Sequence, residues 1–158
     1  IPFHSSPFQL VMNRGHYYLV GNHENYDDMS TLRVDRIAHI TVLSERRKPL
    51  REIKGYQQQR TFNVSQYAKE HIYMFGGESI TVSFKAKRSI VNQILDWFDG
   101  NVEFTNVTAD DVVCRVRVNH HAFKYWALQY MQSVKVLSPA SLVTEVKEAI
   151  KEGLQQYS

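Results

Sequence analysis

The chain has 158 residues, a formal net charge of +3 and a single cysteine, Cys114. Hydrophobic residues make up 43% and charged residues 22%, an ordinary balance for a globular protein. No apolar run approaches the roughly 18 residues that cross a bilayer, so we expect no contact with a membrane. One cysteine excludes an internal disulfide and favours a reducing compartment, so we expect a cytoplasmic protein. Since the chain begins with Ile1, we expect it to be part of a longer protein.

The basic charge is concentrated in the first part of the chain. Residues 1–60 hold nine basic and six acidic side chains, and this excess of three equals the net charge of the whole chain. Such a modest net charge means that nucleic-acid binding would require a local basic patch.

The first part of the chain is predicted to be β-structure. Runs rich in β-branched and aromatic residues lie close together, and Gly15 suits a tight hairpin loop between the first two. Short strands in close succession indicate a small β-barrel, with no helix before residue 49. The expected strands cover residues 8–12, 16–21, 30–37 and 38–43.

Residues 44–60 are polar and basic, and Pro49 and Gly55 interrupt them. One interpretation is a solvated linker with a short helical turn, placed at residues 49–61. The alternative is a basic arm that contacts a partner. On the linker interpretation, Arg46 and Arg47 are not preorganised, and they should matter little for binding.

A helix is predicted to begin after residue 62. Asn63 suits an N-cap, Gln66 stands at the capping-box position, and Phe62 can pack against Tyr67. Gly76 and Gly77 are predicted to end this helix.

From residue 79 the hydrophobic periodicity alternates between strands and helices in the order βαββαβ, followed by a terminal helix. This order is the split-βαβ, or ferredoxin-like, pattern, with two helices on one face of a four-stranded sheet. The other face is predicted to be polar and somewhat basic, and it would carry Arg115 and Arg117. The chain is therefore predicted to be an α+β protein.

Three motifs in this order resemble the WYL domain of bacterial transcription regulators. Tyr17-Tyr18-Leu19 stands where that family has its Trp-Tyr-Leu run, and Arg33-Val34-Asp35-Arg36-Ile37 matches the family's Arg-hydrophobic-Asp-Arg-Ile run. Residues 6–11 are similar to the Pro-x-x-Leu segment that precedes the Trp-Tyr-Leu run in this family. Residues 134–150 and Tyr157 are similar to the extension that commonly follows WYL domains.

The resemblance implies a WYL-type Sm-like or SH3-like barrel at residues 1–48 and an α/β extension at residues 62–158. Since only six residues precede Pro7, the barrel is expected to be truncated, and its open edge should pair with another chain or domain. The resemblance also implies a ligand-sensing and oligomerisation part of a regulator. Such a regulator binds DNA through an N-terminal helix-turn-helix, which is missing from this chain. The implied partners are a short single-stranded nucleic acid or a nucleotide-like effector and a second copy in a homodimer. A dimerisation module without a ligand of its own is the alternative.

The arginines near residue 35 have two interpretations. In strict alternation Arg33 and Arg36 lie on opposite faces, so only a bulge or bend would bring them into one site. The structural interpretation is that Asp35 pairs with one arginine and holds the hairpin together. The functional interpretation is that both guanidinium groups bind phosphate. The predicted ligand-binding residues are Tyr18, His23, Arg33, Arg36, Arg115 and Arg117.

No motif predicts catalysis, a metal or a cofactor. The sequence has no nucleophile elbow, phosphate-binding glycine loop or zinc-protease motif, and Cys114 lies on a predicted buried face. A polar hairpin loop explains His23, Glu24, Asp27 and Asp28 more simply than a metal site does. We therefore expect a protein that is not an enzyme.

Overall fold

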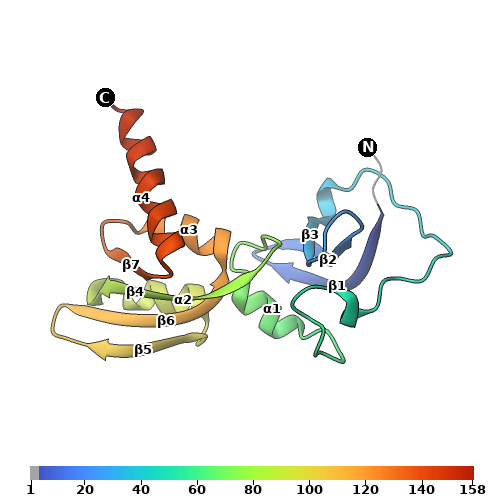
Figure 1. The fold of residues 1–158 in the computed structure, drawn as a ribbon, viewed down its shortest axis with the longest axis horizontal. Coiled ribbons are helices and arrows are strands. Elements are labelled where there is room, and N and C mark those ends of the chain that lie inside the picture. Colours follow the sequence, from blue (N-terminus) through green and yellow to red (C-terminus); the bar gives the residue numbers. More distant parts are fainter. Residues whose placement is uncertain (1–3) are drawn as a thin grey trace. The chain divides into compact units, whose positions relative to one another are not determined.

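A computed structural model describes residues 4–158 (Figure 1). The chain divides into two compact units, Ile1–Glu78 and Ser79–Ser158. Both units combine an antiparallel sheet with helices, so the protein belongs to the α+β class, as predicted. None of the helices in the described part is long and apolar enough to cross a membrane.

The first unit is built on a three-stranded antiparallel sheet of order β1-β2-β3. β1 covers Ser5–Asn13, β2 covers His16–His23 and β3 covers Ser30–Arg33. The β1–β2 turn has positive φ values at Arg14 (48°) and Gly15 (80°). Glycine adopts such angles without steric cost, which explains its place in this turn.

The sheet does not close into a barrel, so the Sm-like or SH3-like barrel is not confirmed. Within residues 4–158, β1 and β3 each pair with β2 alone, which leaves one open edge on each. The expected strand at residues 38–43 is wrong, because these residues form neither strand nor helix. Ile40 and Val42 are 74% and 93% exposed there. A strand needs a neighbour for its backbone groups, and this segment has none.

The third strand is shorter than predicted. It ends at Arg33, and a 3₁₀ turn, η1 (Val34–Arg36), follows it where we expected extended chain and no helix. The backbone N–H of Ile37 donates to the carbonyl of Val34 at 3.1 Å and closes this turn. The strict alternation of side chains therefore stops at Arg33.

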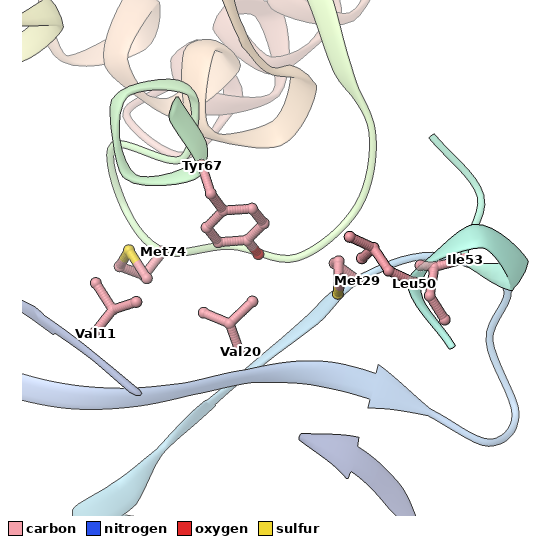
Figure 2. Packing of buried hydrophobic residues seen from close by; sticks show 7 residues of the cluster. All are labelled: Val11, Val20, Met29, Leu50, Ile53, Tyr67 and Met74. Atoms are coloured by element: carbon pink, nitrogen blue, oxygen red, sulfur yellow. The ribbon is translucent and has the colours of Figure 1, made fainter. Parts of the chain in front are cut away.

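The core of the first unit includes residues well beyond the sheet (Figure 2). Val11 and Val20 from the sheet face Tyr67 of α1 (Val64–Glu70). Leu50 and Ile53 join them from the region that we expected to form a linker, around η2 (Leu50–Glu52). Ile53 is fully buried. Residues 49–61 are therefore tied to this unit by hydrophobic packing.

The start of α1 follows the predicted capping pattern. The Asn63 side chain accepts a hydrogen bond from the Gln66 N–H at 3.0 Å, and the Phe62 ring lies 5.3 Å from that of Tyr67. The helix ends at Glu70, earlier than predicted. His71 follows, with its ring stacked 3.8 Å from the Tyr67 ring.

The second unit has a four-stranded antiparallel sheet of order β5-β6-β4-β7. The chain order is βαββαβ with a terminal helix, which confirms the predicted pattern. The strands are β4 (Ser79–Lys87), β5 (Val102–Val107), β6 (Asp111–Asn119) and β7 (Val134–Ser138). The helices are η3 (Arg88–Ile90), α2 (Val91–Phe98), α3 (His120–Gln129) and α4 (Ala140–Gln155), and α4 carries the C-terminal end away from the sheet (Figure 1).

An aromatic cluster joins the sheet to α2 and α3. Phe84 of β4 lies 6.2 Å from Phe98, 5.2 Å from Phe123 and 5.3 Å from Trp126, measured between ring centroids. All four rings are fully buried. Contacts of this kind explain why both helices cover one face of the sheet.

Candidate functional site

The end of β3 carries a preformed arginine–carboxylate pair, and we call residues 33–36 the arginine turn. Nε of Arg33 donates to Oδ1 of Asp35 and Nη2 donates to Oδ2, both at 2.8 Å. This bidentate geometry is the one that a guanidinium group also uses for phosphate. The pairing of Asp35 with one arginine, which was the structural alternative to phosphate binding, is therefore present.

Three cationic or titratable groups gather around the Asp35 carboxylate. The hydrogen bonds from Arg33 lower the pKa of Asp35 to about 2, and the charges of His16 and Arg36 act in the same direction. Nδ1 of His16 lies 3.9 Å from Oδ2 of Asp35. The 3₁₀ turn introduces a bend after Arg33, at the point where strict strand alternation would place Arg33 and Arg36 on opposite faces.

Arg36 differs from Arg33 in its surroundings. It is exposed, and it forms no hydrogen bond or ion pair with any residue among 4–158. Arg33 is partly buried, and its hydrogen bond to Asp35 raises its pKa. One guanidinium group of the turn is therefore held in place by a carboxylate, while the other is open to solvent.

Tyr18 lies beside this turn. It is opposite Arg33 in the β2–β3 register and opposite Val11 in the β1–β2 register, so the three side chains share one face. The ring packs against the buried core cluster. Tyr18 therefore has a structural role in addition to its place next to Arg33.

His23 lies apart from the arginine turn. It is five residues beyond Tyr18 on β2, a separation of roughly 16 Å along a strand. Its Nδ1 accepts a hydrogen bond from the Asn25 N–H at 3.1 Å, and its ring lies 5.2 Å from that of Tyr26. The structure therefore places His23 at the end of β2, where the following loop begins.

The two remaining predicted residues, Arg115 and Arg117, belong to the second unit. They lie on β6, opposite Ser83 and Thr81 of β4, and both are exposed on the sheet face that the helices leave uncovered. Glu103 of β5 faces Arg115 in the register. The expected polar, partly basic face is therefore present.

Two features of the first unit escaped sequence reasoning. His16 was not assigned to the site, although it directly precedes the Tyr-Tyr-Leu run. Arg47 was assigned to a flexible linker, yet its Nη1 donates to the Pro7 carbonyl at 2.9 Å and its Cζ lies 4.8 Å from the Phe8 ring centroid. The stated reason for expecting Arg47 to matter little is therefore wrong.

The side chains of the arginine turn are of the kind that can bind an oxyanion. A guanidinium fork and a second arginine bind phosphate or carboxylate groups, and Tyr18 adds a ring and a hydroxyl group nearby. Among residues 4–158, no group of three His, Cys, Asp or Glu side chains is arranged to hold a metal ion. Cys114 is buried in the second unit, and burial raises its pKa to about 11.

One comparison with a solved structure supports the fold, and a second match is weaker. A CRISPR Cas-related protein matches 98% of the chain with a TM-score of 0.53 and 13% identity, and the match covers 43% of that protein. Proteasome accessory factor B/C (PafBC) of Arthrobacter aurescens matches 99% of the chain with a TM-score of 0.47 and 17% identity, over 22% of its length. The chain therefore spans less than half of either structure.

Family models match both units. The WYL domain matches residues 2–42, and the WCX domain matches residues 76–154, which is half of the chain. No curated protein shows significant sequence similarity to the chain. The chain therefore belongs to the WCX domain family, and a WYL domain match precedes its WCX domain.

Proposed function

We propose that this chain is the ligand-sensing and oligomerisation part of a bacterial transcriptional regulator. Its effector is an anion, either a short single-stranded nucleic acid or a nucleotide-like molecule. Arg33 and Arg36 bind the phosphate groups, with Tyr18 beside them. The regulator binds DNA through a helix-turn-helix in a longer protein, and it acts in the cytoplasm as a homodimer.

The observation that carries this proposal is the Arg33–Asp35 pair. The carboxylate of Asp35 holds the Nε and Nη2 side of the Arg33 guanidinium group at 2.8 Å, so the N–H groups of Nη1 are held in a fixed orientation for an oxyanion before any ligand arrives. Such preorganisation lowers the entropic cost of binding. The match of the WYL domain over residues 2–42 supports the same assignment, since it includes the whole arginine turn.

The proposal also includes His23, Arg115 and Arg117, which lie outside the arginine turn. Arg115 and Arg117 are exposed cations on β6 of the second unit and suit contact with an anionic ligand. His23 suits a contact farther along an extended ligand, because it lies well beyond Tyr18 on β2.

The test is fluorescence anisotropy of a labelled 12-nucleotide oligothymidylate at several salt concentrations. Arg33→Ala and Arg36→Ala should each weaken binding, and each should flatten the log–log salt slope by about 0.7, the value for one phosphate contact on a single strand. Nucleoside monophosphate added as a competitor measures whether a nucleotide alone suffices.

Lys151→Ala provides the matched control, since it removes one exposed positive charge from α4. It should leave both affinity and slope unchanged. Binding of Arg33→Ala and Arg36→Ala that equals binding of Lys151→Ala would contradict the assignment of the effector site.

A second candidate function is dimerisation without an effector. Leu10, Met12 and Tyr17 are 52%, 67% and 54% exposed, and they lie on the sheet face opposite to the core. Exposed apolar residues beside open strand edges favour association with another chain.

Sedimentation equilibrium distinguishes the two candidates. A dimer that forms without ligand and binds no oligonucleotide supports the dimerisation module. A dimer that also binds oligonucleotide supports the sensor. A protein that stays monomeric at all concentrations would contradict self-association in both.

A further inference from the structure

A short stretch of the first unit holds more positive charge than the chain as a whole. Residues 44–60 contain six basic and two acidic side chains, a balance of +4 against +3 for all 158 residues. All the basic side chains except Lys48 are exposed. The basic residues are Arg46, Arg47, Lys48, Arg51, Lys54 and Arg60.

The N-terminal part of this stretch is attached to β1. Arg47 donates to the Pro7 carbonyl at 2.9 Å and stacks on Phe8 with its Cζ 4.8 Å from the ring centroid. The next residue reinforces the contact, because the backbone N–H of Lys48 donates to Oγ of Ser6 at 2.8 Å. The chain is therefore fixed where the basic residues begin.

The other end is attached through the core. The side chains of Leu50 and Ile53 belong to the buried core cluster, in which they lie beside Met29 (Figure 2). The backbone N–H of Lys54 donates to the Asp27 carbonyl at 2.7 Å. Residues 47–54 thus form an ordered strip that buries Leu50 and Ile53 and exposes its charged side chains except Lys48. We call this segment, together with Arg46, the basic strip.

The charges of the basic strip are not neutralised within the described part of the chain. Arg46, Arg51 and Lys54 form no ion pair there, although Glu45 and Glu52 are their sequence neighbours. Arg47 uses one of its five N–H donors for Pro7, and stacking on a ring leaves the other donors in the guanidinium plane. An ordered strip with uncompensated cations suits a ligand with repeated negative charges.

We propose that the basic strip is a second nucleic-acid contact surface, separate from the arginine turn. It binds the phosphate backbone of a nucleic-acid strand without reading the bases, since its contacts are cations and not a base-sized pocket. Arg46, Arg51 and Lys54 contact phosphates, and Arg47 holds the strip against β1. The inference takes the class of its ligand from the proposed function, but it requires no particular effector at the arginine turn.

The experiment removes charge from the strip and keeps its anchors. Arg46→Ala/Arg51→Ala is compared with Lys147→Ala/Lys151→Ala, which removes two exposed charges from α4. Anisotropy is measured with the labelled 12-nucleotide oligothymidylate and with a labelled duplex of equal length, across a salt series. Circular dichroism verifies that both variants are folded.

The strip variant should flatten the single-strand salt slope by about 1.4, the sum of two contacts at about 0.7 each, while the α4 variant keeps the parent slope. Equal slopes for strip variant and parent would overturn the inference. Equal flattening in both variants would also overturn it, because net charge alone would then explain binding. Binding of the duplex alone would exclude a single strand as the ligand and likewise overturn it.

The two proposals fail separately. Loss of binding in Arg33→Ala and Arg36→Ala with normal binding in the strip variant would support the effector site and contradict the proposal for the basic strip. The reverse result would support the basic strip and contradict the effector site.

Discussion

Asp35 occupies the hydrogen-bonding fork of Arg33 in the same bidentate manner that a phosphate group would use. A ligand that binds Arg33 through this fork must therefore displace the Asp35 carboxylate or share the guanidinium group with it. Asp35 orients Arg33 and competes for it at the same time. The balance between these two effects determines how strongly the arginine turn binds an anion.

The first prediction concerns this competition. Asp35→Asn should strengthen oligonucleotide binding several-fold, because it removes a negative charge and releases the Arg33 fork. Asp96→Asn makes the same change of charge at an exposed position of α2. Anisotropy at low salt measures both variants. If the two variants bind equally well, the general loss of negative charge explains the gain and Asp35 does not compete with the ligand.

The second prediction concerns pH. Because the folded-state pKa of Asp35 lies near 2, below its ordinary value of 3.8, the Arg33–Asp35 pair stabilises the folded state fully above about pH 4. This contribution is lost as the pH falls through 2. The carboxyl carbon shift of Asp35, followed by NMR, should therefore titrate near pH 2 in the parent and near its ordinary value in Arg33→Ala. A midpoint near 4 in the parent would show that the pair does not persist in solution.

The third prediction tests whether residues 49–61 belong to the first unit. Ile53→Ala removes a fully buried side chain from the core and should cost about 2–5 kcal/mol of stability. Amide hydrogen exchange of the β1–β2 hairpin measures this loss within the first unit. Gln58→Ala, an exposed neighbour, should change stability by less than about 0.5 kcal/mol. Unchanged hairpin protection in Ile53→Ala would mean that the segment is a linker after all.

The fourth prediction concerns the hydrogen bond between α1 and β3. Oγ1 of Thr31 and the hydroxyl of Tyr67 lie 2.8 Å apart, and burial raises the pKa of Tyr67 to about 12. Tyr67→Phe and Thr31→Val should each cost about 1 kcal/mol, because each leaves the other group without this partner. The double variant should cost less than the two single losses added together. Additive losses in hydrogen-exchange stability would show that the two hydroxyl groups do not interact.

The second unit could be predicted closely because its signals are local. Val82, Phe84 and Ala86 alternate with polar residues on β4, and all three are buried. Pairs of neighbouring residues then determine which face points inward, and no long-range information is needed. The capping pattern at Asn63 could be predicted for the same reason, because it depends only on neighbouring residues.

The first unit was harder to predict because its packing is not local. Leu50 and Ile53 stand alone among charged residues, so nothing in their neighbourhood indicates burial. Arg47 contacts Pro7 and Phe8 across about 40 residues of sequence. Such contacts depend on which distant residues the folded chain brings together. In the same way, the strand propensity of residues 38–43 does not reveal that this segment has no partner strand.

The arginine turn was predictable in its chemistry and not in its geometry. The motif around Asp35 indicated an arginine–carboxylate pair, but a strand places Arg33 and Arg36 on opposite faces. The bend arises because the chain closes a 3₁₀ turn after Arg33, with the Ile37 N–H bonded to the Val34 carbonyl. Propensity alone did not favour a turn here, because Val34 and Ile37 are β-branched residues that favour extended chain.

The last prediction concerns Cys114, which lies on β6 and is fully buried. With a pKa of about 11, the thiolate form is scarce at neutral pH, at about one part in ten thousand. A thiol-reactive dye should therefore label Cys114 only when the second unit unfolds. Both tryptophans, Trp97 and Trp126, lie in that unit, so their fluorescence reports the same event. Labelling should follow the loss of tryptophan fluorescence across a urea series, whereas an exposed cysteine introduced by Ser89→Cys should react at once. Rapid labelling of Cys114 in the folded parent, at the rate of the introduced cysteine, would show that the thiol is accessible and would reopen a role for it as a nucleophile.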